Sequence, residues 1–210
     1  TICERAQEEA FLLEGVKIVV KDYIHNEESE FHYENGLLAF MNYLHEDKDV
    51  LHEPVIFSGE SNGINIKCAF QYTDGYQENT FSYVNLVRTK DGGTHEVGYK
   101  TAFTKTINDY ARNNGLLKEK DKNFEGSDVR EGLTSIIVVT IPEDLLQFEG
   151  QTKGKLGTPI AKTAVDNVVS EHLMYFLVEN KDLATTLIKK IQRAAYARDA
   201  ARKAKDEARA

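Results

Sequence analysis

The chain has 210 residues, of which 41% are hydrophobic and 29% are charged, and its formal net charge is −8. This length allows a sizeable core in one domain or two small ones, and the acidic charge argues against a protein that coats nucleic acid. No apolar run approaches the ~20 residues of a membrane span, and no basic-then-apolar leader is present, which argues against secretion. The two cysteines, Cys3 and Cys68, have no metal-binding or redox spacing, so we expect a cytoplasmic protein.

Hydrophobic periodicity and turn residues predict a series of helices and strands. In chain order they are a helix over residues 4–13, a strand over 16–21, a helix that begins after Gly36, strands over 55–59, 64–72 and 80–87, a helix over 96–113, a strand over 133–141, and helices that begin at Pro159 and Asp182. Asn62-Gly63 is typical of a two-residue hairpin turn and joins two of these strands. Thr158 precedes the proline and is expected to cap its helix with its hydroxyl group.

Together these elements predict an α+β fold, in which a strand-rich first half is followed by a mixed sheet that helices cover on one face. Residues 133–141 are nearly continuous in Leu, Ile and Val, which predicts a strand buried on both faces. Cys68 falls in an alternating strand and is expected to be a small buried hydrophobe. The last ~15 residues have high helix propensity but no apolar stripe, so we expect a helix that does not pack on the core.

Basic residues are concentrated at the end of the chain. Residues 188–210 contain eight lysines and arginines against three acidic residues, so this segment carries +5 and the rest of the chain −13. The segment is either a solvated helix or a contact for the DNA backbone, which needs positive charge but no sequence readout. Tyr196 is the only aromatic residue there, so sequence-specific recognition is not expected. The candidate DNA contacts are Arg198, Arg202, Lys203 and Arg209.

Residues 148–157, Phe-Glu-Gly-Gln-Thr-Lys-Gly-Lys-Leu-Gly, form a glycine-rich loop with one amide, Gln151, and two ammonium groups, Lys153 and Lys155. Glycines allow a backbone to approach a ligand closely, and lysine is a flexible point charge suited to a phosphate oxygen. The loop is not a Walker A sequence, because no glycine lies five residues before a Gly-Lys-Ser/Thr. A solvated connection without a ligand is the alternative interpretation.

Other polar residues are expected to serve the fold. The six histidines are scattered and match no metal-ligand spacing, so no metal site is predicted. His95, at a helix start in Gly-Gly-Thr-His, is expected to be a polar cap rather than a catalytic group, and His172 is expected to be partly buried. Asp128 and Arg130 are expected to anchor the strand that follows them, through an ion pair or backbone hydrogen bonds. No Ser/His/Asp or Cys/His set is convincing.

Three sequence blocks carry a resemblance to a known family. They are Lys-Asp-Gly-Gly-Thr-His-Glu-Val-Gly at residues 90–98, Ser-Asp-Val-Arg-Glu-Gly-Leu at residues 127–133, and the loop at residues 148–157. In their order and approximate spacing, the chain closely resembles the transducer domain that follows the ATPase domain in B subunits of bacterial type IIA topoisomerases. The resemblance covers nearly the whole chain, from about Arg5 to Ala210.

Two details resemble the B subunit of topoisomerase IV more than that of gyrase. Residues 142–148, Pro-Glu-Asp-Leu-Leu-Gln-Phe, make a longer segment than is usual in gyrase before the Gln-Thr-Lys loop. Residues 87–91, Val-Arg-Thr-Lys-Asp, are also similar to the topoisomerase IV form.

The resemblance implies a fold and a division of the chain. The fold is the ribosomal protein S five domain 2-like fold, with its left-handed βαβ crossover, followed by a long basic C-terminal helix. Residues 1–182 would be the core of the transducer domain, and residues 183–210 would be the helix that leads toward a DNA-cleavage region. Because the chain starts at Thr1 and stops inside a helical pattern, we expect it to be a piece of a longer subunit.

The resemblance also implies a role in an ATP-dependent type II topoisomerase, with DNA relaxation and decatenation as the reaction of topoisomerase IV. Gln151 and the catalytic Lys153 would contact the γ-phosphate of ATP, while Lys155 is the weaker candidate. ATP and magnesium would be held mainly by the preceding ATPase domain, because the chain lacks that family's nucleotide pocket and DNA-cleavage motifs. The isolated chain is therefore expected to be inactive. Its expected partners are the ATPase domain, the topoisomerase A subunit, DNA, and a second B subunit in an ATP-dependent dimer.

A different class of function is the alternative. The chain could be a non-catalytic α+β module that binds nucleic acid through its basic helix alone. Dependence on ATP separates the two hypotheses, because the alternative requires DNA binding that is unchanged by nucleotide when the chain is joined to its N-terminal neighbour.

Overall fold

The computed structural model describes the whole chain, residues 1–210. The helices are α1 (Ile2–Leu12), α2 (Gly36–Leu44), α3 (Thr94–Asn113), α4 (Gly126–Arg130), α5 (Pro159–Glu179) and α6 (Lys181–Arg209), with a 3-10 turn η1 (Glu143–Leu145). The strands are β1 (Lys17–Asp22), β2 (Glu27–His32), β3 (Val55–Ser61), β4 (Ile64–Tyr72), β5 (Asn79–Val84), β6 (Val87–Arg88), β7 (Leu133–Thr140), β8 (Phe148–Glu149) and β9 (Lys155–Leu156). None of the helices combines the length and the apolar character that crossing a membrane requires.

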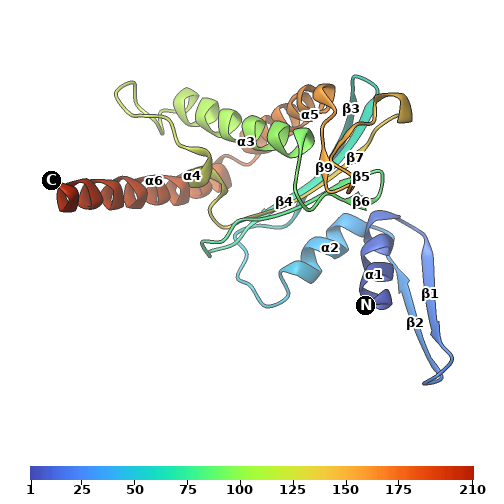
Figure 1. Cartoon of the computed structure of the whole chain (residues 1–210). Helices are drawn as coiled ribbons and strands as arrows, with labels where there is room; N and C mark the ends of the chain where they lie inside the picture. Colours follow the sequence, from blue (N-terminus) through green and yellow to red (C-terminus); the bar gives the residue numbers. More distant parts are fainter.

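A five-stranded mixed sheet, in the order β3-β4-β7-β5-β6, is the framework of the molecule (Figure 1). Its central strand β7 is antiparallel to β4 on one side and parallel to β5 on the other. A parallel pair needs a crossover connection, and α3 lies in the segment that joins β5 to β7. The predicted α+β class is therefore confirmed. The handedness of the crossover and the ribosomal protein S five domain 2-like fold remain predictions.

Helices lie on both faces of the sheet, and not on one face as predicted. α3 and α5 pack on one face, where they help to bury a cluster of 32 residues, and α1 and α2 lie on the other (Figure 1). The second face carries a smaller cluster that includes Phe11, Phe40 and Tyr83. The apolar stripe of α2 indicates which side of the helix is buried, but it contains no information about which sheet face it meets. Between the two layers, β7 is buried along almost its whole length, as its sequence predicts.

The β3–β4 hairpin confirms the prediction from Asn62-Gly63. Ser61 pairs with Ile64 across the two-residue turn, and both turn residues have positive φ, 53° and 75°. A turn of this kind matches the natural twist of the two strands. On β4, Cys68 is fully buried and burial raises the pKa of its thiol, so it is the small apolar residue that the alternation predicts.

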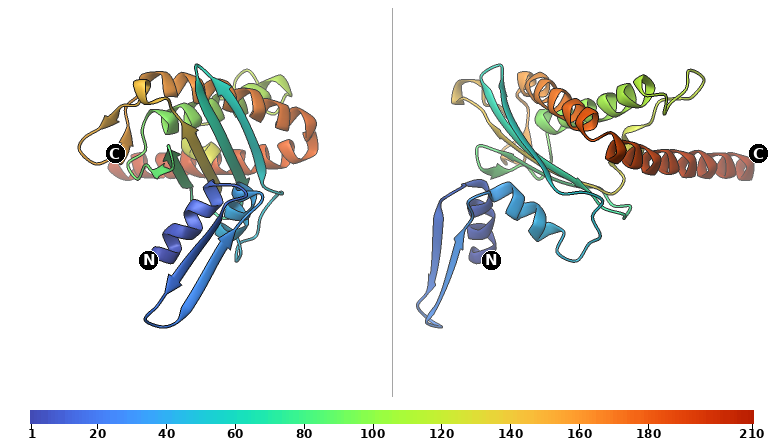
Figure 2. Two further views of the ribbon diagram at one scale, coloured as in Figure 1. Left: turned by 90° about the vertical axis from the view of Figure 1, so that its right-hand side faces the viewer. Right: turned by 180° about the vertical axis from the view of Figure 1, so that it is seen from behind.

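The sequence predicted one strand with the wrong end and missed another strand. β5 ends at Val84 and not at residue 87, because Asn85 and Leu86 both take positive φ and turn the chain into β6. β2 was missed because its sequence, Glu-Glu-Ser-Glu-Phe-His, gives almost no apolar signal. It pairs with β1 in a hairpin that projects away from the main sheet (Figure 2).

α6 is a 29-residue helix with two different environments. Its first half completes the core through Leu187, Ile188 and Ile191, whereas residues 200–210 are exposed and project beyond the other elements (Figures 1 and 2). Residues 200–209 are helical without core packing, as predicted, whereas Arg198, also within the last ~15 residues, pairs with the buried Asp128 of α4. The predicted division after residue 182 stays a prediction, and the buried part of α6 belongs to the same core as α3 and α5.

Buried histidines predict that the fold is less stable in mild acid. Burial lowers the pKa of His45 and His52, and it lowers the pKa of His95 from 6.5 to about 4. Below about pH 6.5 the unfolded chain therefore binds protons that the folded chain does not, so stability decreases as the pH is lowered. We expect the free energy of unfolding to drop by about 1–2 kcal/mol between about pH 7 and about pH 5 from His95 alone. Urea unfolding at both values measures this, and equal stability at the two would contradict it.

Candidate functional site

The Gln-Thr-Lys segment is the tip of a small antiparallel hairpin. β8 pairs with β9, and Gln151 and Lys153 are exposed at the turn between them. Lys155 lies on β9, where its Nζ is 2.9 Å from Oε2 of Glu149 on β8, and this carboxylate raises the pKa of Lys155. Lys153 forms no such ion pair. The structure thus separates the two lysines: Lys155 already has an anionic partner, and Lys153 is available to an external anion.

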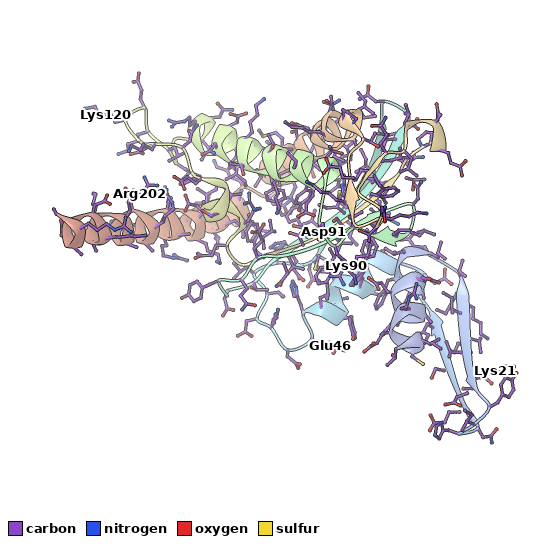
Figure 3. All side chains as sticks on the ribbon, in the orientation of Figure 1. Lys21, Glu46, Lys90, Asp91, Lys120 and Arg202 are labelled. Carbon is purple, nitrogen blue, oxygen red and sulfur yellow. The ribbon has the colours of Figure 1, made fainter.

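The hairpin is docked on the turn that precedes α3, so two of the three sequence blocks lie together. The Asp91 amide donates to the Gly154 carbonyl at 2.8 Å, and the Leu156 amide donates to the Gly92 carbonyl at 3.1 Å. Gly93 forms a parallel bridge with Leu156 at a φ of 137°, and a Cβ atom there would overlap the Leu156 backbone. The turn, which contains the labelled Lys90 and Asp91 (Figure 3), therefore sets where the hairpin lies.

Thr158 links the loop before the hairpin to α3, and it does not have the predicted role of a helix cap. Its hydroxyl does not cap α5; it donates to the Leu145 carbonyl at 2.9 Å and accepts from the Gln147 amide at 3.0 Å. Its carbonyl accepts from the hydroxyl of Thr94, the first residue of α3, at 2.7 Å. Pro159 does begin α5, as predicted. The capping prediction failed because the loop before the hairpin competes for the same hydroxyl.

His95 is not the polar helix cap that its position predicted. It is the second residue of α3, its side chain is fully buried, and its Nε2 lies 2.9 Å from Oγ1 of Thr89. Its Nδ1 atom has no hydrogen-bond partner. Because burial disfavours the charged ring, His95 is neutral at physiological pH. His172, in contrast, is partly buried as predicted, and it stacks on Phe57 with ring centroids 5.1 Å apart.

The remaining sequence block, residues 127–133, lies where α4 contacts α6, which we call the α4–α6 joint. Asp128 and Arg130 were predicted to enter the strand, but they lie in α4, and they are not paired with each other. The buried Asp128 carboxylate accepts from Arg198 Nε at 2.9 Å and Nη2 at 3.1 Å, and it also accepts from the Glu125 amide at 2.8 Å. Arg130 pairs with Glu78 at 2.6 Å. An ion pair at Asp128 was thus expected, but its partner lies 70 residues away.

Lys190 was missed by the sequence analysis. It is buried on α6, and its Nζ donates to the Gly75 carbonyl at 2.9 Å and to the Glu131 carbonyl at 3.2 Å. Burial lowers the pKa of Lys190. The available signal was its position on the apolar stripe of α6, three residues after Leu187 and one before Ile191. Together with Arg198, it fastens α6 to the segment before β7.

The four candidate DNA contacts are therefore not equivalent. Arg198 is committed to Asp128, and Arg202 lies 3.4 Å from Glu125 while remaining more than half exposed (Figure 3). Lys203 and Arg209 lie in the fully exposed end of α6. Arg209 continues the side of the helix that carries Arg198 and Arg202, whereas Lys203 falls on a different side. No group of three or more His, Cys, Asp or Glu side chains could hold a metal ion.

Comparison with known proteins places this arrangement in a family. The family model for DNA gyrase B matches residues 36–207, which include the turn before α3, the α4–α6 joint and the hairpin. The chain belongs to the DNA gyrase B family.

Relatives within the DNA gyrase B family favour the topoisomerase IV type, as the sequence resemblance does. The chain is 61% identical over 209 residues to the B subunit of DNA topoisomerase 4 from Bacillus subtilis and 58% identical over 200 residues to that from Enterococcus faecalis. These matches cover 100% and 94% of this chain, but only 32% and 29% of the relatives. The chain thus spans about a third of the length of the curated relatives it matches.

Solved gyrase B and topoisomerase IV structures have the same fold. The 43K ATPase domain of Thermus thermophilus gyrase B superposes with a TM-score of 0.86 at 39% identity, over 98% of this chain and 55% of that one. The topoisomerase IV ATP-binding domain of Francisella tularensis gives a TM-score of 0.80 at 27% identity, over 94% of this chain and 53% of that one.

The α4–α6 joint predicts a large difference between two neighbouring arginines. Arg198→Ala leaves the buried Asp128 carboxylate without its cation, so we expect the free energy of unfolding to fall by about 2 kcal/mol or more. Arg202→Ala removes one long, exposed contact and should change it by less than about 0.5 kcal/mol. Denaturant unfolding of the two variants makes the comparison, and equal losses would show that the joint does not depend on the Asp128–Arg198 pair.

Proposed function

We propose that the chain is the transducer domain of a B subunit of an ATP-dependent type II DNA topoisomerase, with the relaxation and decatenation reactions of topoisomerase IV. The observation that carries the proposal is the position of Lys153. It is exposed at the tip of a hairpin whose base is fixed by backbone hydrogen bonds to the turn before α3. Membership of the DNA gyrase B family, and solved relatives described as ATPase and ATP-binding domains, support it.

The hairpin tip fits one phosphate group rather than a whole nucleotide. Gln151 supplies amide donors and Lys153 supplies an ammonium group, and both are exposed with no enclosing walls. ATP supplies the phosphoryl group whose transfer to water releases energy for strand passage. Gln151 would orient the γ-phosphate, and Lys153 would stabilise the negative charge that grows on its oxygens. The remaining nucleotide contacts and the magnesium ligands belong to the ATPase domain of the subunit.

The same contact provides a means of coupling ATP binding and hydrolysis to the orientation of the domain. Lys153 has its anionic partner only while the γ-phosphate is present, so binding and hydrolysis change the free energy of one domain orientation relative to another. The hairpin is joined through α3 and the core to α6, which extends away from it. We propose that this helix leads toward the DNA-cleavage region, the topoisomerase A subunit and DNA. We also propose that the subunit acts in the cytoplasm, and that ATP binding brings it together with a second B subunit in a dimer.

Substitution of the two loop lysines tests the assignment. In a B subunit that contains this chain and its ATPase domain, Lys153→Ala should lower the kcat of ATP hydrolysis by roughly 30- to 1,000-fold, with a much smaller effect on nucleotide binding. Lys155→Ala is the matched control, because Lys155 already pairs with Glu149, and it should have little effect. Steady-state hydrolysis and nucleotide titration give both quantities. Equal hydrolysis by the two variants would rule out the assignment of Lys153.

We also propose that the exposed end of α6 makes a salt-sensitive, sequence-independent contact with DNA. Lys203 and Arg209 are the better candidates, because Arg198 serves the α4–α6 joint and Arg202 is near Glu125. Each phosphate neutralised contributes about −0.9 to the slope of log affinity against log salt.

Charge removal at the two ends of α6 tests this contact. In the intact B subunit, Lys203→Ala with Arg209→Ala should flatten the slope by up to roughly 2 units, without altering preference among duplex sequences. Lys181→Ala, at the opposite end of α6, removes an exposed charge and should leave the slope unchanged. Fluorescence anisotropy across a salt series measures the slopes. An unaltered slope in the double variant would mean that the end of α6 is only a solvated helix.

A further inference from the structure

His95 is the one residue of the Gly-Gly-Thr-His segment whose side chain the proposed function leaves unexplained. Its ring is fully buried and neutral, and its Nδ1 is the single buried side-chain nitrogen or oxygen in the chain without a hydrogen-bond partner. Leaving such a buried polar atom unpaired costs about 1–3 kcal/mol. An apolar side chain would avoid this cost, so burial alone does not explain a histidine at this position.

The other nitrogen of the ring takes part in a directed chain of hydrogen bonds. Oγ1 of Thr89 lies 3.0 Å from the Ser82 carbonyl oxygen on β5, to which the hydroxyl can donate, and 2.8 Å from Oγ of Ser82. Oγ1 of Thr89 also lies 2.9 Å from Nε2 of His95, and if the hydroxyl donates to the Ser82 carbonyl, the neutral ring carries its proton on Nε2. The Thr89 amide also donates to the Ser82 carbonyl, at 2.9 Å. His95 is thus linked through Thr89 to a strand of the central sheet.

The turn between these two residues carries the Gln-Thr-Lys hairpin. Thr89 directly precedes Lys90–Gly93, Thr94 and His95 follow it, and the Gly92 amide closes the turn by donating to the Thr89 carbonyl at 3.0 Å. The outward side of the same turn holds the hairpin through the bonds of Asp91 to Gly154 and of Leu156 to Gly92. Loss of the His95–Thr89 bond would leave Thr89 held only by its bonds to Ser82, and it would weaken the anchoring of the turn on which the hairpin docks.

We propose that His95 is a positioning residue for the Gln-Thr-Lys hairpin, acting through Thr89 and the Lys90–Gly93 turn. It touches no nucleotide itself; it holds in place the backbone from which Lys153 is presented. The consequence for ATP hydrolysis rests on the function proposed above, whereas the effect on the hairpin's docking does not. Displacement of a contacting group by about 1 Å can lower a rate by up to about 100-fold, so a small movement of the hairpin is sufficient.

Amide exchange in this chain tests the docking without any nucleotide. The Asp91 and Leu156 amides report on the hairpin's base, and the Thr73 amide, bonded to the Gly132 carbonyl at 2.9 Å, reports on the opposite end of the sheet. His95→Asn keeps a polar group only near the Nδ1 position and should speed exchange at the first two amides by about 10-fold, with Thr73 unchanged. His95→Gln places an amide near the Nε2 position and should restore slow exchange. Equal exchange in both variants and the unaltered chain would overturn the proposal.

A double-substitution cycle in the intact B subunit tests the link to Lys153. His95→Asn should lower kcat for ATP hydrolysis by about 10-fold with KM changed less than about 2-fold, and His95→Gln should recover most of the rate. In the Lys153→Ala background, His95→Asn should have almost no further effect on kcat, because both act on the same contact. If the two losses multiply instead, His95 acts elsewhere and the inference is wrong.

The outcomes separate the two proposals. If Lys153→Ala hydrolyses ATP normally, the proposed function fails, whatever His95 does to amide exchange. If Lys153→Ala is impaired but His95→Asn is not, only the role of His95 fails. Thr89→Val removes the hydroxyl that Nε2 contacts, together with its bonds to Ser82, with little change in side-chain size, and it should reproduce His95→Asn in both assays. It therefore gives the same decision if His95→Asn does not fold.

Discussion

Docking of the β8–β9 hairpin against the turn before α3 is the constraint on which the arrangement of this molecule depends. Two backbone hydrogen bonds and the close approach of Gly93 to Leu156 hold a short hairpin that two residue pairs could not stabilise alone. At Gly98, a Cβ atom would overlap the Lys162 backbone, so α5 also approaches α3 closely. The hairpin, α3 and α5 therefore form one packed unit.

A second joint connects that unit to the long helix. Lys190 binds two carbonyls at the end of the sheet, and Arg198 binds the buried Asp128 carboxylate on α4. A buried carboxylate is unfavourable without its cation, so this pair favours one direction of α6 over others that would leave Asp128 unpaired. Basic residues of α6 consequently divide into those that fix the helix on the domain and those that stay exposed beyond it. The division explains how one helix can be both a structural element and a candidate DNA contact.

The sequence predicted the elements well because helices and hairpins depend on neighbouring residues. The apolar stripe of α3, the Asn62-Gly63 turn and the apolar run of β7 are local signals, and all three were confirmed. Glycine and lysine content also identified the Gln-Thr-Lys loop as a candidate site, although its role stays a prediction. What could not be predicted joins distant residues: Arg198 to Asp128, 70 positions apart, and Lys190 to Gly75, 115 apart. Local signals also gave Thr158 and His95 the roles of caps, because competition from other elements for their side chains is invisible in sequence.

The hairpin tip is proposed to sense the γ-phosphate of ATP. Amide exchange at residues 150–154 of the intact B subunit, compared between a non-hydrolysable ATP analogue and ADP, tests it most directly. We expect exchange at the tip to slow by about 10-fold or more with the analogue and to change little with ADP, because only the analogue offers Lys153 a terminal phosphate. Lys153→Ala should remove the difference. Equal exchange with the two nucleotides would contradict the claim.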